Sequence, residues 1–262
     1  VSTQSTGTKK YDMPLKIQSP TSQKQYQRVE QIGQGLYSTV YQVLCEGEKM
    51  AAKFICLSQL NGAELELIQR EQNFAQYILK QKDQFNFVID YKEVFQFMDV
   101  KENSNVLCIV MEIGLGSLAQ YLQIIQTISP NQIKLIFDQI VVAIHGLHTK
   151  GIIHRDVKPD NIMICDDSND NFLVKLIDFG FCKDGPGQTM VGTSDYVHPK
   201  IVRGEKHSVE VDIWSLGASL KEILEYVSEG DQNTDEYKTL KFISQSMMTE
   251  IDQISLDLYI QK

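Results

Sequence analysis

Hydrophobic and polar positions divide the chain into a strand-rich first part and a helix-rich second part. Short apolar runs of the kind that form strands occupy Val40–Cys45, Met50–Leu57, Phe85–Phe97 and Val106–Met111. Between the second and third runs, apolar residues recur about every three or four positions at Leu67, Phe74, Ala75 and Ile78. That spacing predicts one helix, from about Asn61, among the strands.

The second part contains two strongly specified helices. Ser129, Pro130 and Gln132 form a helix start, because the serine and glutamine side chains can bond backbone N–H groups that lack a helical partner. The apolar positions that follow keep helical spacing, at Ile133, Ile136, Ile140, Ile144 and Leu147. We predict a buried helix that ends near Gly151. Another helix is predicted from about Val209 to Tyr226.

The N-terminal stretch has a different composition from the rest. Residues 1–24 consist largely of Ser, Thr, Gln and Lys, interrupted by Pro14 and Pro20, and show no apolar period. We therefore predict a disordered tail at 1–24.

Charge and cysteine usage limit the class of partner and the compartment. The chain has 262 residues, 42% of them hydrophobic, and a formal net charge of −9. An acidic chain argues against nucleic acid and anionic membranes as partners and is compatible with a basic peptide substrate. No apolar run reaches the roughly 18 residues of a membrane helix, and no signal segment opens the sequence. Its five cysteines are scattered and never spaced as CxxC, which predicts reduced thiols in the cytoplasm or nucleus.

Two segments of the first part carry groups suited to phosphate binding. Gly33-Gln34-Gly35 lies between two predicted strands, where glycines let backbone N–H groups approach phosphate oxygens closely. Lys53 lies inside an apolar strand, so its ammonium needs an anion nearby or a path to solvent. By itself each feature also fits an ordinary glycine turn or a surface lysine.

The second part holds a more specific set. In the segment HRDVKPDN, Asp156 is followed by Lys158 and Asn161, which places a base, a cation and an amide in one loop. Phosphoryl transfer to a hydroxyl needs that combination. Asp178, in Asp178-Phe179-Gly180, follows the strand-like run Phe172–Ile177, and a carboxylate at a strand end can hold Mg²⁺.

These segments together resemble eukaryotic protein kinases from about Tyr26 to Tyr259. The matching motifs stand in the order GQGLYSTV, AAK, VMEIG, HRDVKPDN, DFG, GTSDY and DIWSLG. The resemblance implies one catalytic domain at 25–262 of the α+β class, with a two-lobed fold. A small antiparallel-sheet lobe with one helix (25–113) precedes a larger helical lobe (114–262), and ATP and Mg²⁺ bind between them.

The resemblance also implies the roles of single residues. Lys53 contacts the α- and β-phosphates, and Lys158 steadies the γ-phosphate. Asp156 accepts the proton of the substrate hydroxyl. Asn161 and Asp178 hold Mg²⁺. The chain resembles the serine/threonine class of protein kinases at two positions, Lys158 and Thr193 of the GTSDY motif.

The partner of Lys53 and the adenine pocket follow from the same comparison. Among nearby acids, Glu71 shares the apolar stripe of the helix and follows Arg70, whereas Glu66 lies on the polar face and Glu64 two turns earlier; we expect Glu71 to pair with Lys53. Adenine would lie against the apolar residues Ile32, Val40, Ala51 and Met163, with Met111 as gatekeeper and backbone bonds at Glu112 and Gly114.

The chain departs from the family pattern at three places. Ser38 replaces the third glycine of the loop, and Lys200 stands where a glutamate is expected. That glutamate normally pairs with a late arginine, and Gln253 occupies the arginine position, so both partners are absent together. The segment between Tyr226 and Phe242 is short, which predicts an abridged helical lobe.

Substrate preference and control are also predicted. By the same resemblance, Phe181 implies Ser rather than Thr as the acceptor, and Glu222 implies basic residues near it. Thr189, four residues before Thr193, has the spacing of an activating phosphorylation site, with Arg155 and Lys183 as cationic partners of the phosphate.

We therefore expect an ATP- and Mg²⁺-dependent protein serine/threonine kinase. The alternative is a pseudokinase that binds nucleotide without turnover, which would lack one of the catalytic residues. A small-molecule kinase of related fold is a third interpretation, and Lys158 and the GTSDY motif argue against it.

Overall fold

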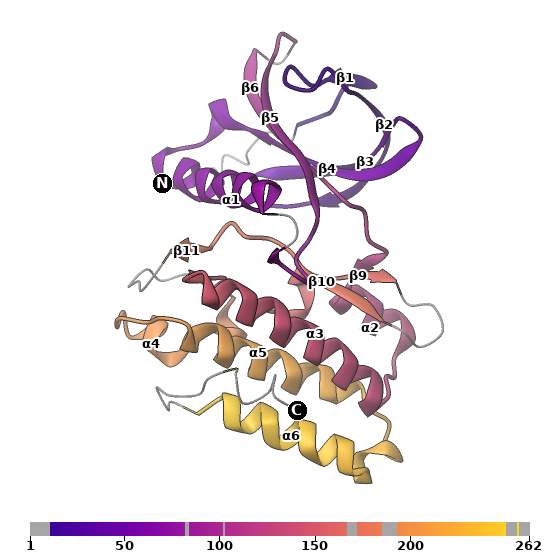
Figure 1. Ribbon diagram of the computed structural model, residues 1–262, viewed down its shortest axis with the longest axis vertical. Coiled ribbons are helices and arrows are strands. Elements are labelled where there is room, and N and C mark those ends of the chain that lie inside the picture. The colour runs from indigo at the N-terminus through magenta and orange to yellow at the C-terminus, as the bar shows by residue number, and fades with distance from the viewer. Residues whose placement is uncertain are drawn as a thin grey trace, which may run out of the picture. The chain divides into compact units, whose positions relative to one another are not determined.

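The chain forms two compact units, each described here by itself. The computed structural model describes residues 11–81, 84–101, 103–166, 172–184, 193–249 and 256 (Figure 1). Unit 1 comprises Val1–Lys82 with Asp90–Ile113, and unit 2 comprises Asp83–Ile89 with Gly114–Lys262. The main boundary therefore lies between Ile113 and Gly114.

Unit 1 is a six-stranded antiparallel sheet with one long helix. Its strands are β1 (Lys16–Gln18), β2 (Gln25–Gln34), β3 (Ser38–Cys45), β4 (Glu48–Cys56), β5 (Tyr91–Asp99) and β6 (Ser104–Met111), and their order in the sheet is β1-β2-β3-β4-β6-β5. Helix α1 (Gly62–Lys80) follows the 3₁₀ turn η1 (Leu57–Gln59) and packs against β5. Asn61 caps α1 by accepting the backbone N–H groups of Ala63 and Glu64, which confirms the predicted helix start.

The predicted strand over Phe85–Phe97 begins only at Tyr91. The residues before it belong to unit 2, where the Ile89 N–H donates to Leu176 O at 3.1 Å and Leu176 N–H donates to Phe87 O at 2.8 Å. The apolar run is therefore shared between two cores, which a local pattern cannot reveal.

Residues 11–24 differ from the disordered tail that their composition predicted, while residues 1–10 lie outside the described residues. Tyr11, Met13 and Ile17 are buried, and β1 pairs with β2. Their side chains join a cluster with Phe54 and other residues on the sheet face opposite to Lys53, because side chains alternate along β4. Three apolar residues without a regular period are enough to order this segment, because they pack on a surface that the sheet provides.

Unit 2 is mainly helical. Its α-helices are α2 (Leu118–Ile125), α3 (Pro130–Thr149), α4 (Pro199–Val202), α5 (Glu210–Ile223) and α6 (Asp235–Met247). Short 3₁₀ turns lie at η3 (Pro159–Asn161), η5 (Ser194–Tyr196), η6 (Leu224–Tyr226) and η7 (Asp231–Asn233). Two small sheets complete it, β10-β9-β7 (Leu173–Leu176, Ile162–Asp166, Gly116–Ser117) and β11-β8 (Lys183–Asp184, Ile152–Ile153).

The helix predicted after Ser129 is confirmed. Ser129 and Gln132 form a capping box around Pro130, and all five predicted apolar positions of α3 are buried. The helix predicted to end at Tyr226 instead changes to 3₁₀ geometry at Leu224. Within the described residues, α6 is the only α-helix after α5, and none of the described helices is both long and apolar enough to cross a membrane.

Candidate active site

The segment from His154 to Asn161 in unit 2 places several polar groups around one buried carboxylate. Asp156 is 3% exposed. Its Oδ2 accepts hydrogen bonds from Asn161 Nδ2 and from Lys158 Nζ, both at 2.8 Å. Its Oδ1 accepts from the Thr193 hydroxyl at 3.0 Å and from the Thr193 N–H at 3.2 Å. Four donors therefore orient this carboxylate and offset the cost of burying its charge.

Thr193 links this loop to a segment 35 residues beyond Lys158. Lys158 Nζ lies 2.5 Å from Thr193 Oγ1, so the lysine contacts both the threonine and Asp156. The sequence placed Thr193 only by its motif. Its contact with Asp156 depends on the tertiary fold.

Asp212, at the start of α5, holds the backbone of the same loop. It is fully buried and accepts the N–H groups of His154 at 2.8 Å and Arg155 at 2.7 Å, and it contacts His148 Nε2 at 2.8 Å. Burial alone would raise the pKa of Asp212, but the hydrogen bonds from His148 and Arg155 and the nearby histidines lower it below the ordinary value. A charged Asp212 therefore fixes the loop, a role that the DIWSLG motif alone did not reveal.

The Asp178-Phe179-Gly180 segment lies directly after β10. Phe179 is fully buried and its ring packs edge-on against His154 at 4.8 Å between centroids. The Ile177 N–H donates to Asn161 O at 2.9 Å, so the two segments that carry Asn161 and Asp178 are joined by a backbone bond. Asp178 is exposed and has a left-handed φ of 62°.

Asn161 and Asp178 offer the oxygen ligands that Mg²⁺ prefers. The amide nitrogen of Asn161 donates to Asp156, which leaves its carbonyl oxygen as the atom available to a cation. The oxygen donors of these two segments therefore fit the predicted metal.

Unit 1 contains the predicted lysine pair. Lys53 Nζ lies 2.5 Å from Glu71 Oε1, and Glu71 is 4% exposed. Glu71 lies on the buried face of α1 with Phe74, Ala75 and Ile78. Of the acids near the start of the helix, Glu64 closes the capping box with Asn61, and Glu66 contacts Arg70 at 3.5 Å.

Three of the residues predicted to contact adenine, Val40, Ala51 and Met111, share one face of the sheet with Lys53. Val40 lies opposite Lys53 in the ladder between β3 and β4, and Ala51 lies opposite Met111 between β4 and β6. Ile32 belongs to β2 and is 43% exposed. The loop residues Gly33 and Gln34 end β2, and Gly35 begins the turn to β3.

Close approach explains two of the glycines. A Cβ on Gly35 would lie 2.7 Å from Ser38 Oγ. Because Gly35 has no side chain, the loop has room for Ser38, the residue that replaces the third glycine of the family pattern. In unit 2, a Cβ on Gly114 would lie 2.4 Å from Met163 Cγ, so Gly114 and Met163 are direct neighbours.

Glu112 is anchored by two bonds to Asp90. Its N–H donates to Asp90 O at 2.9 Å, and its carboxylate accepts the Asp90 N–H at 2.6 Å. The Glu112 N–H is therefore already used inside unit 1.

The predicted regulatory residues are only partly described. Thr189 lies outside the described residues, as does Gln253. Lys183 pairs through its backbone with Ile153. Arg155 is buried, with a left-handed φ of 70°. Its position beside Asp156 is thus set by the loop backbone.

Comparison with known proteins identifies the family of this chain. A model of the protein kinase domain matches residues 26–260, and the chain belongs to the protein kinase family. It is 29% identical to the serine/threonine-protein kinase TIO of Arabidopsis thaliana over 88% of this chain and 17% of that protein. It is 30% identical to the serine/threonine-protein kinase pakA of Talaromyces marneffei over 82% of this chain and 33% of that protein.

The rabbit relative, protein kinase C zeta type of Oryctolagus cuniculus, is 26% identical over 85% of this chain and 38% of that protein. The chain thus spans between 17% and 38% of the length of these three relatives. The domain is a serine/threonine kinase domain with the two-lobed fold predicted for it, and its subfamily is unassigned.

Proposed function

We propose that the protein transfers the γ-phosphoryl group of ATP to a Ser or Thr hydroxyl of a protein substrate, with Mg²⁺ as cofactor. The observation that carries this proposal is the set of donors that orients the Asp156 carboxylate. A phosphoryl-transfer site works mainly by positioning and by placed charge, and this loop contains both.

Asp156 is the proposed base for the acceptor hydroxyl. Its Oδ1 contacts the hydroxyl of Thr193, which shows that this oxygen can accept a hydrogen bond from an alcohol. The substrate hydroxyl would donate to the same carboxylate as it attacks. Lys158, 2.8 Å from Asp156, would neutralise charge on the phosphoryl oxygens.

The remaining residues would bind nucleotide and metal. Lys53, held by Glu71, would contact the α- and β-phosphates, and the backbone from Gly33 to Gly35 would lie over them. Asn161 and Asp178 would hold Mg²⁺, which would offset the negative charge of the phosphates. Ile32, Val40, Ala51, Met111, Glu112, Gly114 and Met163 would enclose adenine.

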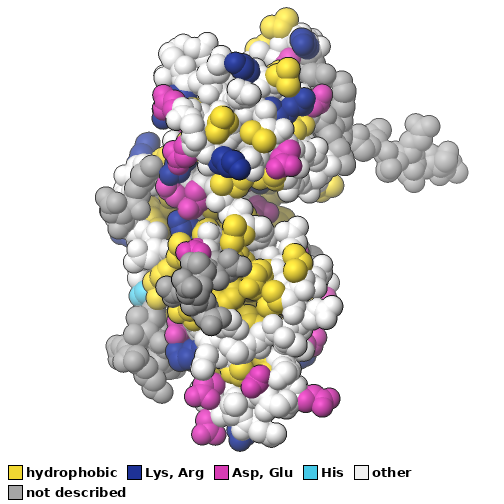
Figure 2. Space-filling view, turned by 90° about the vertical axis from the view of Figure 1, so that its right-hand side faces the viewer, with side chains coloured by type: hydrophobic (Ala, Val, Ile, Leu, Met, Phe, Trp, Pro, Cys, Tyr) yellow, Lys and Arg dark blue, Asp and Glu magenta, His cyan; other side chains and the backbone are white. Residues whose placement is uncertain are grey.

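We further propose that the protein binds neither nucleic acid nor a membrane. Acidic and basic side chains are interspersed on the face displayed in Figure 2, without a continuous basic patch, and the net charge is −9. Five cysteines without a disulfide bond, four of them buried, support a reducing compartment such as the cytoplasm or nucleus.

A radiolabel assay tests the activity. Wild-type protein with Mg²⁺ and γ-labelled ATP should label a mixture of Ser- and Thr-containing peptides, and the Asp178→Asn variant should not. Nucleotide binding by the wild type with no more transfer than this variant would favour the pseudokinase alternative.

Control by phosphorylation at Thr189 is also proposed. Arg155 and Lys183 would pair with the phosphate, and the ordered segment would raise kcat. Thr189→Ala should lower kcat with little change in ATP affinity, and full activity after phosphatase treatment would reject the proposal.

A further inference from the structure

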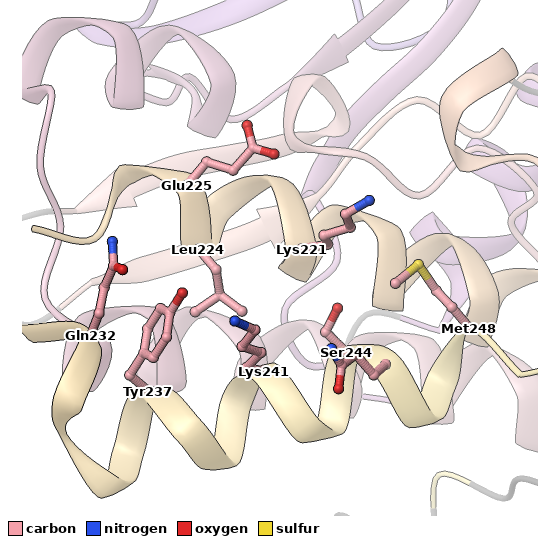
Figure 3. Close-up of a pocket in the computed structure, with 9 residues that line it drawn as sticks. Lys221, Leu224, Glu225, Gln232, Tyr237, Lys241, Ser244 and Met248 are labelled. Atoms are coloured by element: carbon pink, nitrogen blue, oxygen red, sulfur yellow. The ribbon is translucent and has the colours of Figure 1, made fainter. Parts of the chain in front are cut away.

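A groove on unit 2 lies apart from the residues discussed above. It runs between α5 with η6 on one side and α6 on the other, and its volume is about 590 Å³ (Figure 3). Lys221, Leu224 and Glu225 contribute from one side, and Tyr237, Lys241 and Met248 from the other.

Helix packing explains why the groove opens where it does. At Gly217 the two helices approach closely, since a Cβ there would lie 2.7 Å from Met247 Cβ, and Ser244 Oγ donates to Gly217 O at 2.8 Å. Toward the start of α6, the facing positions carry Leu224 and Tyr237 instead. Larger side chains keep helix axes further apart, so the closed end lies at Gly217 and the open end at Tyr237.

The floor of the groove is apolar, while its edges carry cations. Leu224 is 5% exposed and points toward Tyr237 and Lys241 in Figure 3. Lys241 Nζ lies 5.8 Å from the centroid of the Tyr237 ring. Within the described part of the chain, neither Lys221 nor Lys241 has a carboxylate at ion-pairing distance, whereas Lys238 on the same helix lies 3.9 Å from Asp235.

The nature of the polar groups favours a protein segment over a small molecule. A small-ligand site uses a few buried polar groups that are fixed in place. The buried polar side chain in the groove is Ser244, 2% exposed, and its hydroxyl is already donated to Gly217 O. The charged groups of the lining stand on long, exposed side chains, which can reach the carboxylates of a docked peptide segment.

We propose that this groove docks a segment of a protein partner in which a bulky apolar side chain stands next to Asp or Glu. The apolar side chain would cover Leu224 and Met248, and the carboxylate would pair with Lys241, with Lys221 at the edge. Two lysines against Glu225 give the lining a net charge of +1 on a chain whose total charge is −9. Because salt screens charges beyond about 8 Å, this local sign decides the contact.

Fluorescence anisotropy on the full chain tests the proposal without any need for catalysis. The probe is a fluorescein-labelled synthetic peptide, Gly-Glu-Glu-Phe-Leu-Glu-Gly, and its counterpart carries Lys in place of every Glu. We expect the acidic peptide to bind and the basic one to bind much more weakly. Lys241→Glu should weaken binding of the acidic peptide by about tenfold or more.

Lys238→Glu is the matched control, because it makes the same charge change on the same helix outside the groove lining. It should leave binding within about twofold of the wild type. Equal loss in both variants, equal binding of both peptides, or no binding of either would overturn the proposal. Self-association that Lys241→Glu abolishes in sedimentation would overturn it too, because a second copy would then be the occupant. Since ATP is absent from the assay, these results stand whether or not the protein transfers phosphate.

Discussion

Lys200 forms an ion pair with Glu210 that connects α4 to the first turn of α5. Lys200 Nζ lies 3.2 Å from Glu210 Oε1, and both side chains are 19% exposed. The second oxygen of Glu210 accepts the Ser208 N–H at 2.9 Å. In the family pattern a glutamate at this place pairs with a distant arginine, and here Lys200 and Gln253 occupy the two positions. The structure shows that Lys200 has a different partner, only ten residues away.

We expect this pair to stabilise unit 2 measurably. Lys200→Glu places two carboxylates together. It should lower the free energy of unfolding by about 1–3 kcal/mol, because the pair is neither fully exposed nor fully buried. Glu210→Lys should cost a similar amount, and the double exchange should recover most of the loss. Thermal unfolding of the four proteins measures this. Additive losses in the double variant would show that the two side chains do not interact.

Lys53→Met should abolish turnover and also destabilise unit 1. The activity loss, about a hundredfold or more, follows from removing a placed charge. The stability loss, about 3 kcal/mol, follows because Glu71 is 4% exposed and would be left without its cation. Lys53→Met with Glu71→Gln is the control: unfolding should show recovered stability, while kinetics should show no recovered activity. A double variant as unstable as the single one would contradict this account.

Asp156→Asn should reduce kcat by about a thousandfold with little change in ATP affinity. The asparagine keeps the shape but cannot accept the proton of the acceptor hydroxyl. Its amide also offers only one acceptor oxygen to Lys158, Asn161 and Thr193. Single-turnover kinetics and nucleotide binding separate the two effects. A large loss of ATP binding with normal chemistry would remove Asp156 from its proposed role.

Glu222 tests the predicted preference for basic substrates. The Tyr196 hydroxyl donates to Glu222, and burial, followed by the hydrogen bond and charge of Glu222, raises the pKa of Tyr196. Tyr196→Phe leaves the carboxylate in place, so a basic peptide should keep its advantage over a neutral one. Glu222→Gln should raise KM for the basic peptide by about fivefold and leave the neutral peptide unchanged. Equal changes for both peptides would assign Glu222 a structural role only.

Asp212 predicts a specific acid sensitivity. Its lowered pKa means that the folded state favours the carboxylate, so its contribution to stability is present above the ordinary pKa of 3.8 and fades as the pH falls below it. Asp212→Asn should lower stability at pH 7 by about 2–4 kcal/mol, because the backbone donors of His154 and Arg155 lose a charged acceptor. The difference in the free energy of unfolding between Asp212→Asn and the wild type should become smaller below about pH 4. A constant difference from pH 7 to pH 3 would contradict this prediction.

Local pattern was sufficient for several elements of the fold and for contacts within one loop. The start of α3 at Ser129 follows from three residues whose side chains satisfy nearby backbone groups. The loop from Asp156 to Asn161 is equally local, since Asn161 reaches the carboxylate across five residues. Contacts of this kind depend on neighbours in the chain, so their spacing is visible in the sequence.

Other features exist only because distant segments meet. Asp212 bonds the backbone of His154 and Arg155 across more than 50 residues, and Tyr11 lies under a sheet whose strands form far along the chain. Lys200 could have been judged unpaired from the family pattern, yet packing of α4 against α5 supplies Glu210. The packing of helices and strands decides which charged side chains pair and which apolar side chains are buried. The spacing of residues along the chain does not contain that information.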